Sequence, residues 1–386
     1  MRLTERVLRN LKEKRQRIIN GNINSVPSPF KRFSDDFLGI EQGKFYLITS
    51  STKGAKTQFA SFTFIFNLIL YAYNNPKKLR VKIFYYPLEE TQEDILIRFM
   101  SFLLYVLSKR TIRVSTTDLK SIKNDKPLDE KILNILETEE YQSIFKFFEE
   151  SVIFSTSSNP TGVYAECKKY AEDHGKTHYR KVIIKDEFTG KPKEVNAFDY
   201  YEQDDPDEYR IIFYDHVSLI STERNLTLKQ SIDKLSEYCV MLRNRYNFSP
   251  VIIQQQSFEG EGNEAIKLNK LRPTIANLSD SKYLSRDANV VLGLFSPFKF
   301  ELRDYFGYNI MKLRDNVRFL EVLVNRGGSP GGIVALFFDG AVNYFEELPP
   351  PSETGELTKI YSYLDNLRGI NNKLFFSFKL NKKCNG

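Results

Sequence analysis

The sequence Lys44-Phe45-Tyr46-Leu47-Ile48-Thr49-Ser50-Ser51-Thr52-Lys53-Gly54-Ala55-Lys56-Thr57 carries the strongest structural signal in the chain. Its first half is a short apolar and aromatic run that is typical of a buried strand, and the apolar stretch 58–73 behind it is typical of a helix. A loop of small residues between strand and helix can turn backbone N–H groups toward phosphate oxygens. Lys56 is placed for the β/γ-phosphates and Thr57 for Mg²⁺. We therefore expect a nucleotide-binding loop here.

Two positions of this loop depart from the pattern G-x-x-x-x-G-K-[ST]. Ser50 stands for the first glycine and Ala55 for the second. A chance octapeptide in a chain rich in Lys and Thr is the alternative, but the flanking strand and helix favour a true loop. The candidate nucleotide contacts are Ser50, Ser51, Thr52, Lys53, Gly54, Ala55, Lys56 and Thr57.

Outward from the loop, apolar runs alternate with helical patterns. Strands are expected at 81–86, 152–155, 209–214, 251–253, 289–295, 318–325 and 333–338, and helices at 58–73, 91–107, 163–174 and 226–246. Repeated strand–helix–strand units predict an α/β fold with a mostly parallel central sheet and helices on both faces.

Three segments stand apart from this alternation. Residues 1–30 predict a basic helix (4–20) and a linker, ahead of a main domain at 31–348 and a tail at 349–386. The tail holds one expected helix at 357–367 and an apolar end at 374–376. Within the main domain, the insertion 177–208 predicts a β-hairpin that turns at 188–191.

Composition narrows the class of protein. The 386 residues are 41% hydrophobic and 14% aromatic, enough for a sizeable core and unlike a disordered chain. The net charge of +7 is compatible with a polyanionic partner without naming one. Three widely spaced cysteines form neither a disulfide framework nor a zinc site, which favours a reducing compartment. No apolar run approaches the roughly 20 residues of a membrane helix. We expect a soluble cytoplasmic protein without a membrane partner.

Polar residues follow several of the expected strands, where open α/β sheets bind their ligands. Glu89 follows the strand 81–86 and could activate water, and Asp215 ends the strand 209–214 as a Mg²⁺-side acid would. Gln255 follows the strand 251–253 and could sense a γ-phosphate, although its two glutamine neighbours leave that register open by one. The alternative for Glu89 is a surface glutamate, for Asp215 an ordinary acid at a strand end, and for Gln255 a polar strand cap.

Arg326 follows the strand 318–325 and enters a glycine-rich turn, Asn325-Arg326-Gly327-Gly328-Ser329-Pro330. A planar guanidinium on such a turn suits a phosphate contact, either within its own subunit or in a neighbouring one. An ordinary turn arginine is the alternative.

In order along the chain, these stretches resemble the RecA-like ATPase domain of DnaB-type replicative helicases. The stretch Pro87-Leu88-Glu89-Glu90 with Gln92 and Arg98 is similar to the family's S-L-E-M-x-x-x-Q-L-x-x-R. Tyr214 to Leu219 is similar to its I-D-Y-L-Q-L. The stretch from Arg272-Pro273 to Asp287-Ala288-Asn289-Val290-Val291-Leu292 is similar to its R-P…L…D-A-D-V-V-L, and decides against other P-loop families. The resemblance also takes in Val26 to Phe30 and Gly39 to Thr57.

The resemblance implies a role for each candidate. Lys56 and Thr57 would bind the phosphates and Mg²⁺ of ATP, with Asp215 as the Walker B acid beside the metal. Glu89 would be the catalytic carboxylate and Gln255 the sensor amide. Arg326 would be the arginine finger that enters the next subunit's site, which implies a homo-oligomeric ring, usually a hexamer.

The resemblance also implies partners. The helix 4–20 corresponds to a linker helix that docks on a neighbour, and the loop 277–283 to a DNA-facing loop. Lys270 and Lys282 would contact the backbone of single-stranded DNA, and a primase or other replisome protein is a further partner. The family's helical N-terminal domain has no counterpart, and Val324 replaces a family lysine. With a composition rich in Asn, Lys, Ile, Tyr and Phe, these differences lead us to expect a minimal, phage-encoded version.

Three functions follow. The first is an ATP-driven ring helicase that moves on single-stranded DNA in the cytoplasm of a bacterium or an infected host, with hydrolysis at subunit interfaces. The second is a RecA-like recombination or DNA-remodelling ATPase that forms filaments. The third is a structural P-loop protein that does not hydrolyse ATP, motivated by Ser50, Ala55 and Val324.

Overall fold

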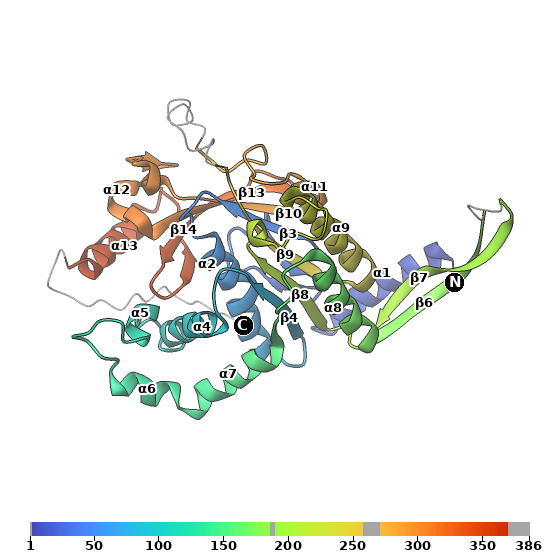
Figure 1. Cartoon of the computed structure of the whole chain (residues 1–386). Helices are drawn as coiled ribbons and strands as arrows, with labels where there is room; N and C mark the ends of the chain where they lie inside the picture. Colours follow the sequence, from blue (N-terminus) through green and yellow to red (C-terminus); the bar gives the residue numbers. More distant parts are fainter. Residues whose placement is uncertain (1, 186–189, 258–270, 370–386) are drawn as a thin grey trace.

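The computed structural model describes residues 2–185, 190–257 and 271–369 and is organised around one nine-stranded sheet (Figure 1). The strand order is β15-β14-β13-β10-β3-β9-β8-β4-β5. The strands are β3 (Tyr46–Ser50), β4 (Arg80–Pro87), β5 (Val152–Phe154), β8 (Glu208–Asp215), β9 (Ser249–Gln255), β10 (Val290–Phe295), β13 (Val317–Asn325), β14 (Ile333–Asp339) and β15 (Tyr344–Glu347).

The sheet has a parallel part and an antiparallel part. The six strands from β10 to β5 run parallel, whereas β13, β14 and β15 pair antiparallel with their neighbours. The prediction of a mostly parallel α/β fold is thus confirmed, but the strands expected at 318–325 and 333–338 belong to a meander. The turns at 326–332 and 340–343 are too short for a parallel crossover, which needs a dozen or more residues.

Helices cover both faces of the parallel part. One face carries α2 (Lys56–Ser61), the π-helical turn η1 (Phe62–Phe66), α3 (Asn67–Asn74), α4 (Gln92–Leu107) and α7 (Glu139–Ser151). The other carries α8 (Pro160–Asp173), α9 (Leu228–Tyr246) and α11 (Tyr283–Asp287). Strand side chains alternate accordingly, so Ile48 packs on the first face and Leu47 on the second. Buried apolar residues pack the helices against both faces of the sheet, and this packing holds the strands and their ends in place.

Short elements follow α4, β8 and β10. They are α5 (Thr116–Leu119), α6 (Glu130–Leu136), the 3₁₀ turns η2 (Val217–Leu219), η4 (Pro297–Phe300) and η5 (Arg314–Asn316), β11 (Asp304–Tyr305), β12 (Tyr308–Asn309) and α12 (Ile310–Leu313). The helix expected at 357–367 is α13 (Thr354–Leu367), which buries Leu357 and Leu364 in a third core cluster with β13 and β14. The apolar end expected at 374–376 lies outside the described residues.

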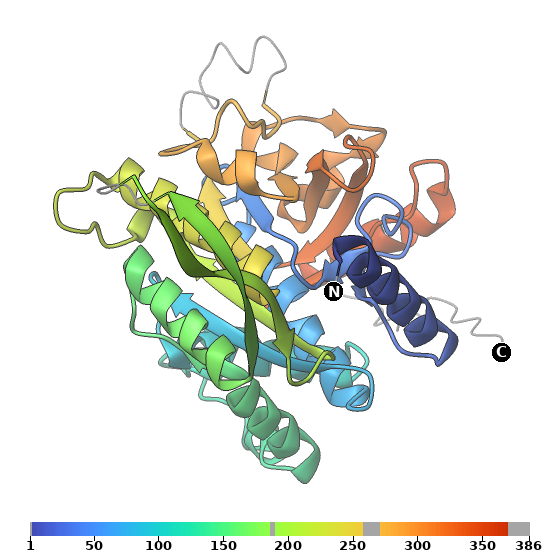
Figure 2. The same cartoon turned by 90° about the vertical axis from the view of Figure 1, so that its right-hand side faces the viewer.

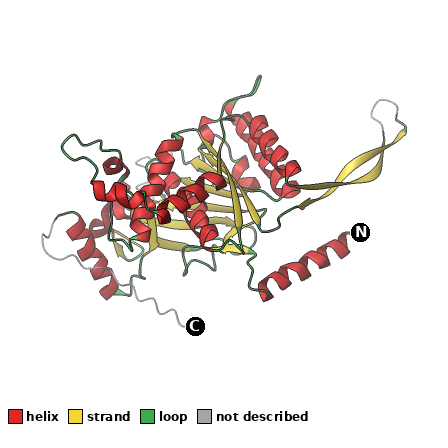
Figure 3. Ribbon diagram, turned by 90° about the horizontal axis from the view of Figure 1, so that it is seen from below, coloured by secondary structure: helices red, strands yellow, loops and turns green. Residues whose placement is uncertain are grey.

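The N-terminal helix and the insertion extend from the same side of the domain (Figures 2 and 3). Helix α1 (Leu3–Ile19) buries no side chain, and the hairpin consists of β6 (Gly175–Lys185) and β7 (Pro192–Gln203). Arg6 pairs with Asp199 on β7 at 3.3 Å, and Arg17 pairs with Asp207 at 2.5 Å. A small ribbon of β1 (Ser25–Pro27) and β2 (Gly39–Glu41) joins α1 to the sheet. Among the described residues, no helix is both long and apolar enough to cross a membrane.

Candidate nucleotide-binding site

The candidate residues come from neighbouring parallel strands whose carboxyl ends share one edge of the sheet. Ser50, at the end of β3, is in register with Gln255 at the end of β9. Asp215 ends β8 and is in register with Pro87 at the end of β4, two residues before Glu89. The fold therefore brings the loop, the acid, the amide and the second carboxylate to one place, as the sequence predicts.

The backbone of the loop has the conformation of an anion-binding concavity. Lys53 and Ala55 adopt left-handed conformations with φ of 60° and 69°, and the intervening Gly54 does not. Such alternation points successive N–H groups into one hollow. A Cβ on Gly54 would lie 2.5 Å from the Ser50 hydroxyl oxygen, so the loop has no space for a side chain there.

Ala55, like Lys53, is a strained position of the loop. It precedes the first turn of α2, and its left-handed conformation costs an alanine about 1 kcal/mol that a glycine would not pay. Ala55 provides no side-chain cap for α2, and the first N–H groups of a helix lack intrahelical acceptors. The end of the helix thus presents N–H donors and its positive dipole to the same hollow.

Thr57 and Asp215 form the centre of the site. The Thr57 hydroxyl donates to Asp215 Oδ1 at 3.1 Å, and Asp215 is only 2% exposed. Burial raises the pKa of the Asp215 carboxyl to about 7; the Thr57 hydroxyl opposes this rise, and the nearby charge of Glu89 adds to it. Two adjacent oxygens of this kind fit Mg²⁺, which takes one or two protein ligands and completes its shell with phosphate and water. The described residues contain no larger cluster of metal-binding side chains.

Glu89 and Glu90 point to different partners. Glu90 pairs with Arg98 on α4, whereas Glu89 remains half exposed with Oε2 at 3.9 Å from His216 Nε2. Burial, together with the charge of Lys56, lowers the pKa of His216. His216 follows Asp215 directly, and that adjacency is the one sequence signal that could have selected it. Of the two carboxylates, Glu89 is the one without an arginine partner among the described residues, and it lies beside His216, which follows the buried Asp215.

The three consecutive glutamines have separate contacts. The Gln255 amide donates to the Thr52 hydroxyl of the loop at 2.6 Å. Gln254 donates to the Ser281 carbonyl at 2.7 Å, and the buried Gln256 donates to the Thr49 hydroxyl at 2.8 Å. Among these side chains, only that of Gln255 contacts the loop 50–57, so it occupies the position proposed for the sensor. The backbone carbonyl of Gln255 accepts a hydrogen bond from the Ser279 N–H at 3.0 Å, which connects the site to the loop 277–283.

Arg326 lies at the opposite edge of the sheet. Because β13 is antiparallel, Asn325 is in register with Val290, which pairs with Tyr46 at the beginning of β3. The five residues of β3 span roughly 13 Å, so an exposed side chain at that edge cannot reach the loop of its own chain. The alternative of a contact within one subunit is therefore wrong. Val324 is partly buried in the second core cluster.

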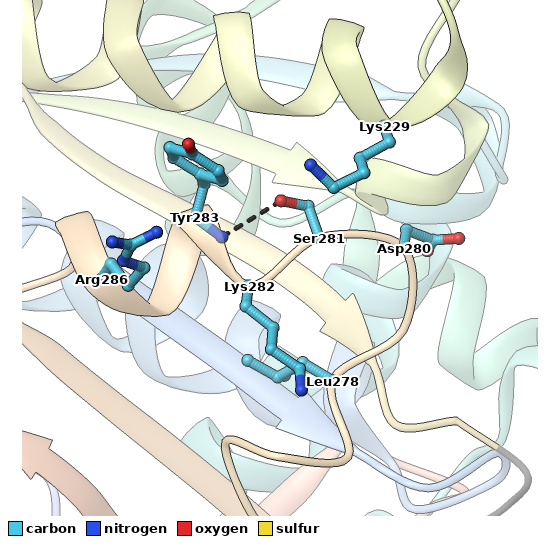
Figure 4. Close-up of a pocket in the computed structure, with 7 residues that line it drawn as sticks. All are labelled: Lys229, Leu278, Asp280, Ser281, Lys282, Tyr283 and Arg286. Atoms are coloured by element: carbon cyan, nitrogen blue, oxygen red, sulfur yellow. Dashed lines mark hydrogen bonds between the residues drawn. The ribbon is translucent and has the colours of Figure 1, made fainter.

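Lys282 lines a cavity of about 260 Å³ beside α9 and α11 (Figure 4). Lys229 and Arg286 complete a set of three cations around it, and both lie over the Tyr283 ring, at 5.3 and 5.0 Å from its centre. The Tyr283 N–H donates to the Ser281 hydroxyl at 3.1 Å and holds this turn in place. Sequence reasoning missed Lys229 and Arg286, which a scan for spaced cations could have found. Lys270 lies outside the described residues.

Sequence reasoning also missed two cations at the loop. Arg318 on β13 donates to the Gly54 carbonyl, and Lys299 in η4 donates to the Thr52 carbonyl. No local pattern marks either residue, because the contacts span more than two hundred residues of chain.

Neither a protein-family model nor a curated protein matches this sequence. Among solved structures, one described as an ATPase domain matches with a TM-score of 0.58 and 16% identity over 89% of this chain and 98% of that one. A DnaB-like replicative helicase, described with its interactions with primase, matches with a TM-score of 0.58 and 15% identity over 90% of this chain and 67% of that one. At such identities the likeness is one of fold. The chain therefore has the RecA-like fold of the ATPase domains of DnaB-type helicases.

Proposed function

We propose that this protein is an ATP-dependent DNA helicase that works as a ring and hydrolyses ATP between subunits. The observation that carries the proposal is the hydrogen bond from Thr57 to the buried Asp215, directly beside a loop whose N–H groups form an anion-binding hollow. Glu89 and Gln255 reach the same sheet edge, which supports hydrolysis and not binding alone.

Each residue has a distinct task in this proposal. Loop N–H groups and Lys56 bind the phosphates of ATP, and the oxygens of Thr57 and Asp215 hold Mg²⁺, which neutralises phosphate charge when bound. Glu89 orients the attacking water and takes up its proton. Gln255 senses the γ-phosphate through its position against Thr52.

The position of Arg326 supports an oligomer. Only a second copy could bring this guanidinium to the phosphate loop, because its own loop lies across the sheet. Helix α1 offers a further contact between copies, since its apolar side chains Leu3, Val7, Leu8, Leu11, Ile18 and Ile19 are all exposed. A head-to-tail contact that closes gives a ring, and we propose a hexamer.

The cations around the cavity of Figure 4 support single-stranded DNA as the partner. Lys282 would contact backbone phosphates there, and loss of the γ-phosphate would be relayed through Gln255 to Ser279 and its loop. A cytoplasmic setting and a primase or other replisome partner belong to the same proposal.

The test is steady-state ATP hydrolysis with Mg²⁺, with and without single-stranded DNA. We expect DNA-stimulated turnover that Lys56→Ala and Glu89→Gln both abolish. Glu93→Gln, an exposed carboxylate in the first turn of α4, is the matched control and keeps parental turnover. Parental rates in Lys56→Ala or Glu89→Gln would refute the proposal.

Two outcomes would favour the other candidates. Turnover with filaments instead of closed rings in electron micrographs would favour a recombination or DNA-remodelling ATPase. A folded protein without Lys56-dependent turnover would favour the structural protein, to which the strained Ala55 already points.

A further inference from the structure

Two cations lie on the outer side of the phosphate loop. The Nε of Arg318 donates to the Gly54 carbonyl at 3.2 Å, and the Nζ of Lys299 donates to the Thr52 carbonyl at 3.0 Å. They come from β13 and η4, which are far from the loop in sequence. Both contacts are to backbone oxygens, so they hold the loop whatever its side chains are.

These two carbonyls belong to particular peptide units. In a planar trans peptide the C=O and the following N–H point in opposite directions. A cation on the Gly54 carbonyl therefore turns the Ala55 N–H away from Arg318, and a cation on the Thr52 carbonyl does the same for the Lys53 N–H. Lys53 and Ala55 are the two left-handed residues whose N–H groups form the anion-binding hollow.

Arg318 is built into the fold as a rigid support. It is only 2% exposed, although it lies at the beginning of the apolar strand β13. Its guanidinium also donates to the Asp315 and Val317 carbonyls and to Asp315 Oδ1, each at 2.8 Å, and lies 4.5 Å from the centre of the Phe338 ring. These contacts fix its position, so the loop carbonyl must adapt to the guanidinium.

We propose that Arg318 and Lys299 clamp the outer side of the phosphate loop and set its affinity for the α/β-phosphates of a nucleotide. They are positioning residues, since neither touches the phosphates. The clamp holds the peptides that precede the two left-handed residues Lys53 and Ala55, and it thereby compensates for the glycine that Ala55 replaces. Hydrogen bonding at each carbonyl also makes the N–H group of the same peptide a stronger donor. This inference rests on the proposed nucleotide site.

The experiment measures binding of ADP with Mg²⁺ to the full chain by calorimetry. ADP carries the α/β-phosphates that the loop N–H groups bind, so its affinity reports the clamp without hydrolysis. We expect Lys299→Met to weaken ADP binding roughly three- to tenfold, the value of one lost hydrogen bond. Lys299→Arg keeps the charge and the donor and should restore most of the affinity.

Lys312→Met is the matched surface control. Lys299 and Lys312 are both exposed, and each lies over an aromatic ring, at 5.2 and 5.1 Å from the ring centre. The ring beside Lys312 is that of Tyr361 on α13, away from the loop. This variant should bind ADP as the parent does.

Arg318→Met should weaken ADP binding more than about tenfold, because the lost hydrogen bond comes from a buried charged donor. Arg210→Met is its control, since Arg210 is 1% exposed and lies near the beginning of β8, at the other edge of the sheet. Both variants should lower the unfolding temperature, but only Arg318→Met should lower the affinity of the folded protein.

Parental ADP affinity in both Lys299→Met and folded Arg318→Met would overturn this inference and leave the proposed function intact. A parent chain that does not bind ADP in a Lys56-dependent manner would overturn both.

Discussion

Replacing Ala55 with glycine tests whether the phosphate loop is already formed before a nucleotide binds. Ala55 has φ of 69° and ψ of 27°, a left-handed conformation that costs an L-residue with a Cβ about 1 kcal/mol. Ala55→Gly removes this cost. If the loop has this conformation in the free protein, the gain of about 1 kcal/mol appears in the free energy of unfolding.

If nucleotide binding imposed the left-handed conformation on Ala55, the same energy would appear in the affinity for ADP. In that case the free protein would gain little, and ADP would bind about fivefold more tightly, which is what 1 kcal/mol amounts to. The structure shows the loop formed with its outer carbonyls held, so we expect the gain in stability and an ADP affinity within about twofold of the parent.

Chemical denaturation and ADP titration of the same preparations separate these results. Gly54→Ala is a control in the same loop that should lower the free energy of unfolding, because its Cβ would lie 2.5 Å from the Ser50 hydroxyl oxygen. Ala60→Gly, in the interior of α2, should also destabilise, by about 1 kcal/mol or more. A destabilised Ala55→Gly would refute the assignment of strain to Ala55.

Arg326→Ala and Lys56→Ala should each be inactive alone, yet an equal mixture of the two should recover roughly a quarter of parental turnover. In such a mixture, about one head-to-tail interface in four joins an intact loop to an intact arginine. No recovery would contradict action between subunits. Lys282→Ala should weaken single-stranded DNA binding similarly for all sequences and reduce the salt dependence by about one charge. Fluorescence anisotropy across a salt series measures this, and an unchanged slope would remove Lys282 from the DNA site. Asp339→Ala should destabilise the protein by about 3–5 kcal/mol, because Asp339 is 1% exposed and accepts two hydrogen bonds from Arg113, at 2.6 and 2.8 Å. A loss under about 1 kcal/mol in chemical denaturation would show that the pair is replaceable.

Local patterns were sufficient for most of the fold. The helix start at Thr91 is confirmed by the hydrogen bond that its side chain accepts from the Asp94 N–H. The insertion also holds the two paired strands of the predicted hairpin, whereas residues 188 and 189 of the expected turn lie outside the described residues. Strand-end residues also locate one sheet edge, because parallel strands all end there. Asp215, Gln255 and the loop come together for that reason.

The direction of a strand is what the sequence did not reveal. Arg326 follows an apolar run just as Gln255 does, but β13 is antiparallel and delivers its last residue to the opposite edge. Arg318 was missed for a related reason, since an arginine in an apolar strand is ordinarily a surface residue, and its loop contact depends on strand order.

If the proposed oligomer forms, helix α1 couples the folding of residues 2–20 to protein concentration. Its 17 residues have no buried side chain in the part of the chain that the structure describes, and an isolated helix of that length is marginal in water. The ion pairs of Arg6 and Arg17 lie at a partly exposed surface, where such pairs contribute about 0–1 kcal/mol each. In the proposed oligomer, most of the stability of this helix would then come from mass action with other copies. Dilution should unravel α1 before it affects the sheet, and far-ultraviolet circular dichroism would show the helical signal fall with concentration while the core stays folded.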